Sequence, residues 1–205
     1  MVALTDADRA LVAQAVAKAE QITSVELRLV LAHSSSHYGA FALIYPALLA
    51  LIAGGIAVAI PTDLDAQTLF FGQASVFFAA VAAMQWLPLR FALIPAAVKR
   101  KAAWRLARLH YASIGLKQPH LRNAVLVFAS SVERSVEILV DDAVAEKLPE
   151  ALWAPVIAEF RACFAEGRVA EAFVNAADSC AHILAQAFPP QPGQASQIPD
   201  ELVEL

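Results

Sequence analysis

The chain has 205 residues, of which 59% are apolar, and its mean hydropathy is +0.57. Soluble domains are about 45–50% apolar, so the composition argues against an ordinary water-soluble domain of this length. The formal net charge is −4 at pH 7, but acids and bases are unevenly distributed along the chain.

The N-terminal segment predicts a helix followed by a strand. Thr5 and Asp8 form a variant of the helix-capping box, and the helix is expected over residues 6–21. Its apolar face is predicted to comprise Leu4, Leu11, Ala15, Ala19 and Ile22. Residues 25–31, VELRLVL, alternate at first and then become apolar, which is typical of a strand with a buried face.

Two uncharged runs follow, at residues 38–60 and 67–89. As a helix rising about 1.5 Å per residue, the first is about 34 Å long, which matches a hydrocarbon layer about 30 Å thick. The connector is short and carries Asp63 and Asp65, so the runs are predicted to form a transmembrane hairpin. The alternative is a long buried helix of a soluble core. No signal peptide precedes the first run, which is therefore expected to act as an uncleaved membrane signal.

Basic residues follow the second run. Between Asp65 and Glu133 there is no acid, and this interval contains Arg90, Lys99, Arg100, Lys101, Arg105, Arg108, Lys117 and Arg122. By the positive-inside rule, both ends of the chain are expected on the cytoplasmic side. The basic stretch would attract anionic lipid headgroups. Nucleic-acid binding is the competing interpretation, and no recognition motif supports it.

The remaining segments predict a helix, two strands and three more helices. Pro95 suits the first turn of a helix that ends at Gly115, with a basic face and an Ala/Trp/Leu face that suits a sheet. Residues 123–129 and 135–140 are expected to pair as an antiparallel hairpin. Asp141 or Asp142 would cap a short helix, and apolar periodicity predicts two closing helices over 150–167 and 168–188.

These elements predict an α/β fold, a three-layer sandwich with a small mixed sheet, interrupted by a two-helix transmembrane hairpin. Residues 1–37 and 90–188 would form one discontinuous cytoplasmic domain, because neither piece is complete alone. Residues 38–89 would form the hairpin. Residues 189–205 are expected to be a flexible Pro/Gln-rich tail with too little apolar surface to fold.

Three acids are candidates for a metal site. Asp141 and Asp142 end a predicted strand, and two adjacent carboxylates suit a hard cation such as Ca²⁺ or Mg²⁺. Glu26 would be a third ligand if its strand is adjacent. The alternatives are a helix cap for the aspartates and a solvated strand position for Glu26.

Other chemistry is not indicated. His33 and His37 lie in a predicted linker, where their spacing does not favour a metal site. No nucleophile elbow, phosphate-binding loop or dinucleotide fingerprint occurs, so no nucleotide is expected. Cys163 and Cys180 are predicted to be reduced core residues.

A family resemblance is carried by three segments: ADRALVAQAVAKAEQITSVELRLVLA, AVLVFASSVERSVEILVDD and FRACFAEGRVAEAFVNAADSCAHIL. They resemble the TPM-domain family, which includes a thylakoid acid phosphatase, and in particular its bacterial membrane-inserted branch. The matching polar positions are Thr23, Ser24, Glu26, Glu133, Arg134 and Asp141. Residues 118–123, QPHLRN, stand where family members commonly have Thr and Gly, so the resemblance does not extend to phosphate chemistry in that loop.

Two functions follow as hypotheses. The first is a noncatalytic adaptor that is held in the bacterial inner membrane by the hairpin and binds a membrane-protein partner on the cytoplasmic side. The second, implied by the family resemblance, is a metal-assisted phosphomonoesterase that uses the acidic site. The sequence names neither the partner nor a substrate.

Overall fold

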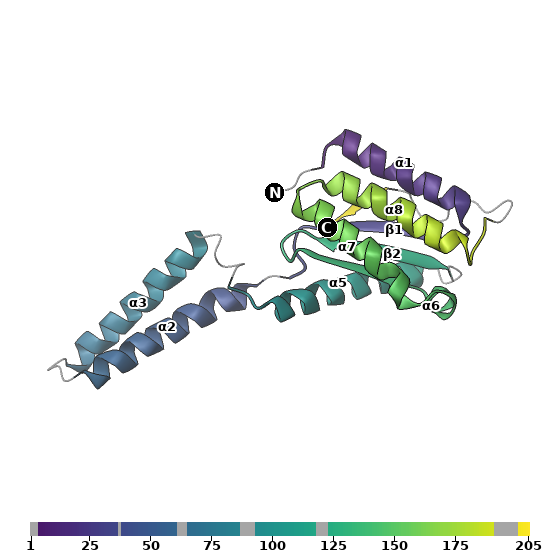
Figure 1. Cartoon of the computed structure of the whole chain (residues 1–205). Coiled ribbons are helices and arrows are strands. Elements are labelled where there is room, and N and C mark those ends of the chain that lie inside the picture. Colours follow the sequence, from purple (N-terminus) through teal and green to yellow (C-terminus); the bar gives the residue numbers. More distant parts are fainter. Residues whose placement is uncertain (1–3, 37, 61–64, 87–92, 118–122, 191–200) are drawn as a thin grey trace. The chain divides into compact units, whose positions relative to one another are not determined.

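The computed structural model describes residues 4–36, 38–60, 65–86, 93–117, 123–190 and 201–205 (Figure 1). The chain divides into two compact units. Unit 1 comprises Met1–Ser35 and Lys99–Leu205, and unit 2 comprises Ser36–Val98. Each unit has its own packing.

Unit 1 is built on a mixed sheet with the strand order β3-β2-β1-β4. Strand β1 (Glu26–Ala32) runs parallel to β2 (Ala124–Ser130) and to the short β4 (Val203–Glu204). Strand β3 (Ser135–Val140) pairs antiparallel with β2, which confirms the predicted hairpin. A parallel pair needs a long crossover, and the crossover from β1 to β2 contains all of unit 2.

Helices cover both faces of this sheet. They are α1 (Asp6–Ile22), α5 (Ala96–Lys117), α6 (Asp142–Lys147), the 3₁₀ turn η1 (Glu150–Leu152), α7 (Trp153–Ala165) and α8 (Val169–Ala185). Side chains alternate along a strand, so Leu27 and Leu29 pack with α1, α7 and α8 while Val30 packs with α5 on the opposite face. Figure 1 shows α1 and α8 on one side of the strands and α5 on the other. The predicted three-layer α/β sandwich is confirmed.

The larger core lies between the sheet and α1, α7 and α8. All seven residues of β2 are buried, as its continuous apolar run predicts for a central strand. Phe160 of α7 and Phe173 of α8 meet edge to face with ring centroids 4.9 Å apart. Cys163 and Cys180 are buried in the same core, which confirms their predicted placement.

The apolar face of α1 differs from the predicted one. Val12, Val16 and Ala19 are buried, whereas Leu11 is 51% exposed. Adjacent helix positions point about 100° apart, so a buried face that contains Val12 and Val16 leaves Leu11 at its exposed margin.

The inner face of α5 is also narrower than predicted. Ala103 and Ala107 are fully buried against the sheet, but Trp104 and Leu109 are 45% and 62% exposed. Small side chains let the helix lie close to the strands, and the bulky Trp104 is turned outward. The helix also continues past Gly115 to Lys117.

The end of the chain is a strand, not part of the expected tail. The Leu205 amide donates to the Leu31 carbonyl at 2.9 Å, and the His33 amide donates to the Leu205 carbonyl at 2.8 Å. Leu202 is buried beside them. Backbone pairing with the open edge of β1, together with the buried Leu202, thus orders residues 201–205 at the end of the tail.

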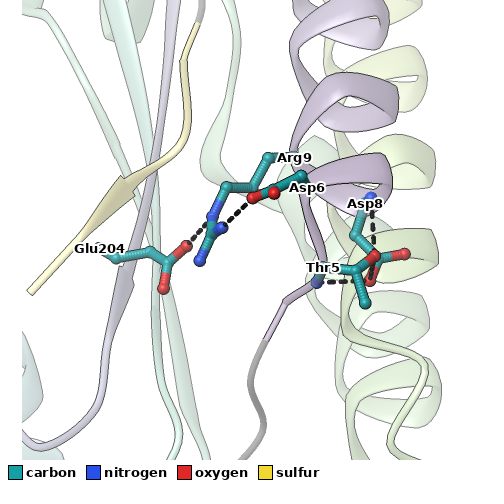
Figure 2. A network of polar contacts seen from close by, with 5 residues as sticks. All are labelled: Thr5, Asp6, Asp8, Arg9 and Glu204. Atoms are coloured by element: carbon teal, nitrogen blue, oxygen red, sulfur yellow. Dashed lines mark hydrogen bonds and ion pairs between the residues drawn. The ribbon is translucent and has the colours of Figure 1, made fainter.

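A polar network joins this strand to the start of α1 (Figure 2). Arg9 donates to Glu204 and to Asp6, at 2.7 Å in each case. Thr5 and Asp8 complete the predicted capping box: the Asp8 amide donates to Thr5 Oγ1, and the Thr5 amide donates to Asp8 Oδ2. Figure 2 shows the two sets of contacts in the same first turn.

The capping box should lower the pKa of the Asp8 carboxyl in a way that depends on Thr5. Hydrogen bonds from Thr5 hold the pKa of the Asp8 carboxyl below its ordinary value of 3.8, so the cap stabilises the fold above that value and this contribution is lost as the pH falls through the lowered pKa. Thr5→Ala should raise the pKa of Asp8 in an NMR titration of its carboxyl carbon. Thr5→Ser keeps the hydroxyl and should keep the low pKa; equal titration of the two variants would contradict this explanation.

Unit 2 is a helical hairpin of α2 (Gly39–Ala59) and α3 (Ala66–Trp86). These bounds lie close to the predicted runs, and residues 61–64 and 87–92, with Asp63 among them, fall outside the described ranges. Ala50 is buried at the contact, and a Cβ added at Gly54 would come within 3.0 Å of the Gln73 side chain. Small residues thus allow the two helices to approach closely.

Candidate functional site

The predicted acids lie at the amino edge of the parallel strands. Asp141 follows β3, but β3 is antiparallel to β2, and the Asp141 amide donates to Ala124, the first residue of β2. Glu26, the first residue of β1, is in register with Ala124. Asp141 and Glu26 therefore do not lie at the carboxyl ends of the parallel strands, where open α/β sheets bind ligands. The rule for carboxyl ends does not apply to Asp141, because β3 runs antiparallel to β2, as the predicted hairpin already implied.

Asp141 acts as the N-cap of α6. Its carboxylate accepts a hydrogen bond of 2.7 Å from the Asp142 amide, and Asp142, in the first turn, is exposed. This is the arrangement that the alternative interpretation expected. Negative charge at a helix N-terminus is favourable, so both aspartates have a structural role in α6.

Glu26 is buried, with 3% of its surface exposed. The alternative of a solvated strand residue is therefore wrong for this position. Since β2 lies between β1 and β3, and neighbouring strands are about 4.8 Å apart, the backbones at Glu26 and Asp141 are about 10 Å apart. Across the described ranges of the chain, no three His, Cys, Asp or Glu side chains are grouped to hold a metal ion. The carboxylates as they stand do not fit the predicted Ca²⁺ or Mg²⁺ site.

Tyr111 is the residue that sequence reasoning missed at this edge. Its hydroxyl on α5 makes a long hydrogen bond of 3.5 Å to the Ala124 carbonyl. Burial, followed by the charges of Asp141 and Asp142, raises the pKa of Tyr111 to about 12. The site is thus a neutral phenol beside two carboxylates. No motif marks it, because the phenol meets the strand edge only when α5 packs on the sheet.

A second polar cluster lies at the opposite, carboxyl edge of β1 and β2. Glu133 is 8% exposed, and its carboxylate accepts hydrogen bonds from the Ser35 amide at 2.9 Å and the Ser34 hydroxyl at 3.3 Å. The fully buried Ser130 hydroxyl also donates to it, and the Ser35 hydroxyl lies 3.0 Å from that of Ser130. We call these four residues the Glu133 cluster.

The Glu133 cluster holds the ends of the two parallel strands together. The Ser131 amide donates to the Ala32 carbonyl and the Val132 amide to the His33 carbonyl, at 3.0 Å each. Arg134 follows in the left-handed region at φ 49° and turns the chain into β3. The sequence signal that points to this cluster is a Ser-x-x-Glu spacing at residues 130–133, which begins at the last residue of β2 after six apolar residues.

Removing the Glu133 carboxylate should destabilise the domain. Glu133→Ala leaves three donors without this acceptor, and buried unsatisfied donors cost about 1–3 kcal/mol each; we expect the free energy of unfolding to fall by about 3 kcal/mol in urea titrations. Glu133→Gln keeps one acceptor oxygen and should lose roughly half as much. An Ala variant as stable as the Gln variant would show that these bonds do not hold the strands.

Two shallow hollows, of about 550 and 470 Å³, lie on the α1, α7 and α8 side of unit 1. Their shared lining is Glu159, Asp178 and Ser179. Lys18 lies 3.7 Å from Asp178, and the His182 Nδ1 lies 2.8 Å from the Asp178 carbonyl. His33 is exposed, and His37 lies outside the described ranges. These polar contacts are local and do not gather further acids at one point.

Residues 91–183 match the family model of the TPM domain, TPM_phosphatase. The stretch includes α5, β2, β3, α7 and most of α8, and the chain thus contains a TPM domain. Helix α1 and strand β1 lie before the match, and β1 pairs with β2 in the same sheet.

The fold is also similar to a solved structure. The NMR structure of the BA42 protein from the psychrophilic bacterium Bizionia argentinensis superposes with a TM-score of 0.60 at 13% sequence identity, covering 98% of this chain and 95% of that one. At this identity the likeness shows the fold alone. No curated protein matches the chain.

Proposed function

We propose that this chain is a membrane-anchored, noncatalytic adaptor. The hairpin of α2 and α3 would insert into the bacterial inner membrane, and unit 1, with its TPM domain, would bind a membrane-protein partner on the cytoplasmic side. The observation that carries the proposal is the exposed apolar surface of both helices.

Both helices present large apolar side chains outward. Leu51 and Val58 of α2 are 64% and 72% exposed, and Phe70 and Phe78 of α3 are 67% and 68% exposed. Each helix has the length and composition of a membrane span. In the most apolar stretch of α2 only 11% of the residues are buried, and in that of α3 the share is 0%. Monomeric proteins in water rarely expose apolar patches of this kind. Lipid is the medium that suits them.

The direction of insertion follows from charge. Helix α5 carries six Lys and Arg residues and no acid, and it follows α3 closely in the chain. The positive-inside rule counts basic residues near the ends of a span. It favours a cytoplasmic α5, with Asp65 and the connector on the opposite side.

The roles of the acids favour an adaptor over an enzyme. Asp141 caps α6, and Glu133 bonds to the backbone and hydroxyls of two strand ends. These carboxylates are engaged in holding the fold. A phosphomonoesterase remains the second candidate, favoured by the name of the matched family model and by the Asp141/Asp142 pair beside Tyr111.

A phosphatase assay separates the two candidates. The full chain, purified in detergent, is incubated with 4-nitrophenyl phosphate with and without Mg²⁺ or Ca²⁺, alongside Asp141→Asn and Asp142→Asn. Asn is also a good N-cap, so α6 should remain folded. Asp6→Asn, on exposed α1, is the matched control.

For an adaptor we expect hydrolysis no faster than in buffer for all four proteins. The same membrane protein should also co-purify in repeated mild-detergent extractions. Hydrolysis that the Asp141 or Asp142 substitution abolishes and Asp6→Asn does not would establish the enzyme instead.

A further inference from the structure

The outward side of α5 combines cations with exposed apolar groups. Its centre is formed by Lys101, Arg105 and Arg108, and Trp104 and Leu109 flank them. All five side chains are exposed. They lie about a turn apart, on the side of the helix opposite the buried Ala103 and Ala107. We call these five residues the outer α5 surface.

The ion pairs within the described ranges do not involve this surface. In that part of the chain, Lys101, Arg105 and Arg108 have no carboxylate within 4.0 Å. The Arg108 guanidinium lies over the Trp104 ring, 4.7 Å from its centroid. This stacking places the Trp104 ring and the Arg108 cation together at the surface.

We propose that the outer α5 surface lies on anionic phospholipid headgroups. Lys and Arg near such a surface each strengthen association by roughly fivefold, as the energy of about 1 kcal/mol per residue implies. Trp favours the level of the headgroups, and Leu109 would enter the boundary of the acyl chains as the apolar side of an interfacial helix does. The proposal rests on the membrane anchoring proposed above.

The position of α5 in the chain favours lipid over nucleic acid as the occupant. Only residues 87–95 separate α5 from the end of α3. A surface so near a membrane span meets headgroups at a high effective concentration. Nucleic acid offers phosphates too, but a single exposed Trp does not provide the repeated stacking that single-stranded recognition uses.

The test places a nitroxide label on the surface itself. Ala112→Cys lies on the outward side of α5, and Ala10→Cys lies on exposed α1, on the opposite face of the sheet. Cys163 and Cys180 are buried, and burial raises the pKa of the Cys180 thiol to about 12, so the new cysteine is labelled selectively. The labelled full chain is reconstituted into nanodiscs of phosphatidylcholine, with or without phosphatidylglycerol.

We expect the Ala112→Cys label to lose water accessibility severalfold when phosphatidylglycerol is added at low salt, measured by EPR with a water-soluble relaxation agent. The Ala10→Cys label should not change. The triple substitution Lys101→Gln, Arg105→Gln, Arg108→Gln should abolish the response, and high salt should weaken it.

Equal accessibility of the Ala112→Cys label in both discs, in chains that have inserted, would overturn the inference. Protection by a soluble oligonucleotide and not by phosphatidylglycerol would overturn it as well, in favour of nucleic acid. Failure of the unlabelled chain to enter neutral phosphatidylcholine discs would instead count against the proposed anchoring, so the two failures are distinguishable.

Discussion

Leu49→Arg should lower the equilibrium constant for insertion of the hairpin into the membrane by roughly 150-fold. Leu49 is at the middle of α2 and is 52% exposed. At the centre of a span, an Arg costs about 2.5–3.5 kcal/mol, and the favourable contribution of the Leu is lost too. The change therefore opposes insertion by about 3 kcal/mol. At an exposed position in water the same change would have almost no effect.

A cysteine in the connector reports the result. Asp65→Cys should react with a membrane-impermeant maleimide in spheroplasts when the hairpin has inserted, and Leu49→Arg should reduce the labelled fraction. Leu49→Phe keeps the site apolar and should label like the parent. Undiminished labelling of the Arg variant would mean that α2 is not surrounded by lipid.

Phe173→Ala should lower the free energy of unfolding of unit 1 by about 4 kcal/mol. Phe173 is fully buried and contacts Phe160 edge to face. Phe-to-Ala changes in cores typically cost about 3–5 kcal/mol through lost burial and the cavity that remains. The loss is measured by urea unfolding in mild detergent, followed by the near-ultraviolet circular dichroism of the domain.

Phe164→Ala is the matched comparison. Phe164 stacks on Phe160 with ring centroids 5.7 Å apart but is only partly buried, so its loss should cost less than that of Phe173. Equal losses would show that the contact between α7 and α8 is not the centre of this core.

Much of the fold could be predicted because it depends on local pattern. The continuous apolar run of β2, the capping box at Thr5 and the apolar runs of α2 and α3 each specify one element with few alternatives. The face of a helix is harder to predict, because Leu11 and Val12 differ by one position and only the docking of α8 decides between them. The order of residues 201–205 depends on the free edge of β1, which the tail sequence does not encode.

The candidate site was less predictable for a topological reason. Asp141 was placed after the correct strand, but that strand is antiparallel to β2, so Asp141 meets the amino edge of β1 and β2 and not their carboxyl edge. Tyr111 and Ala124 are 13 positions apart and come together only when α5 packs on the sheet. The Glu133 cluster likewise forms only when β1 and β2 are neighbours, because Glu133 and its partner Ser35 are 98 positions apart in the sequence.

Extraction of membranes tests the central claim most directly. Membranes from cells that express the full chain are washed with alkaline carbonate and urea, then treated with a mild detergent. We expect the chain to stay in the membrane pellet through both washes and to enter solution only with detergent. A chain recovered in the aqueous supernatant as a folded monomer would contradict the anchoring of α2 and α3 in lipid, and with it the proposed adaptor.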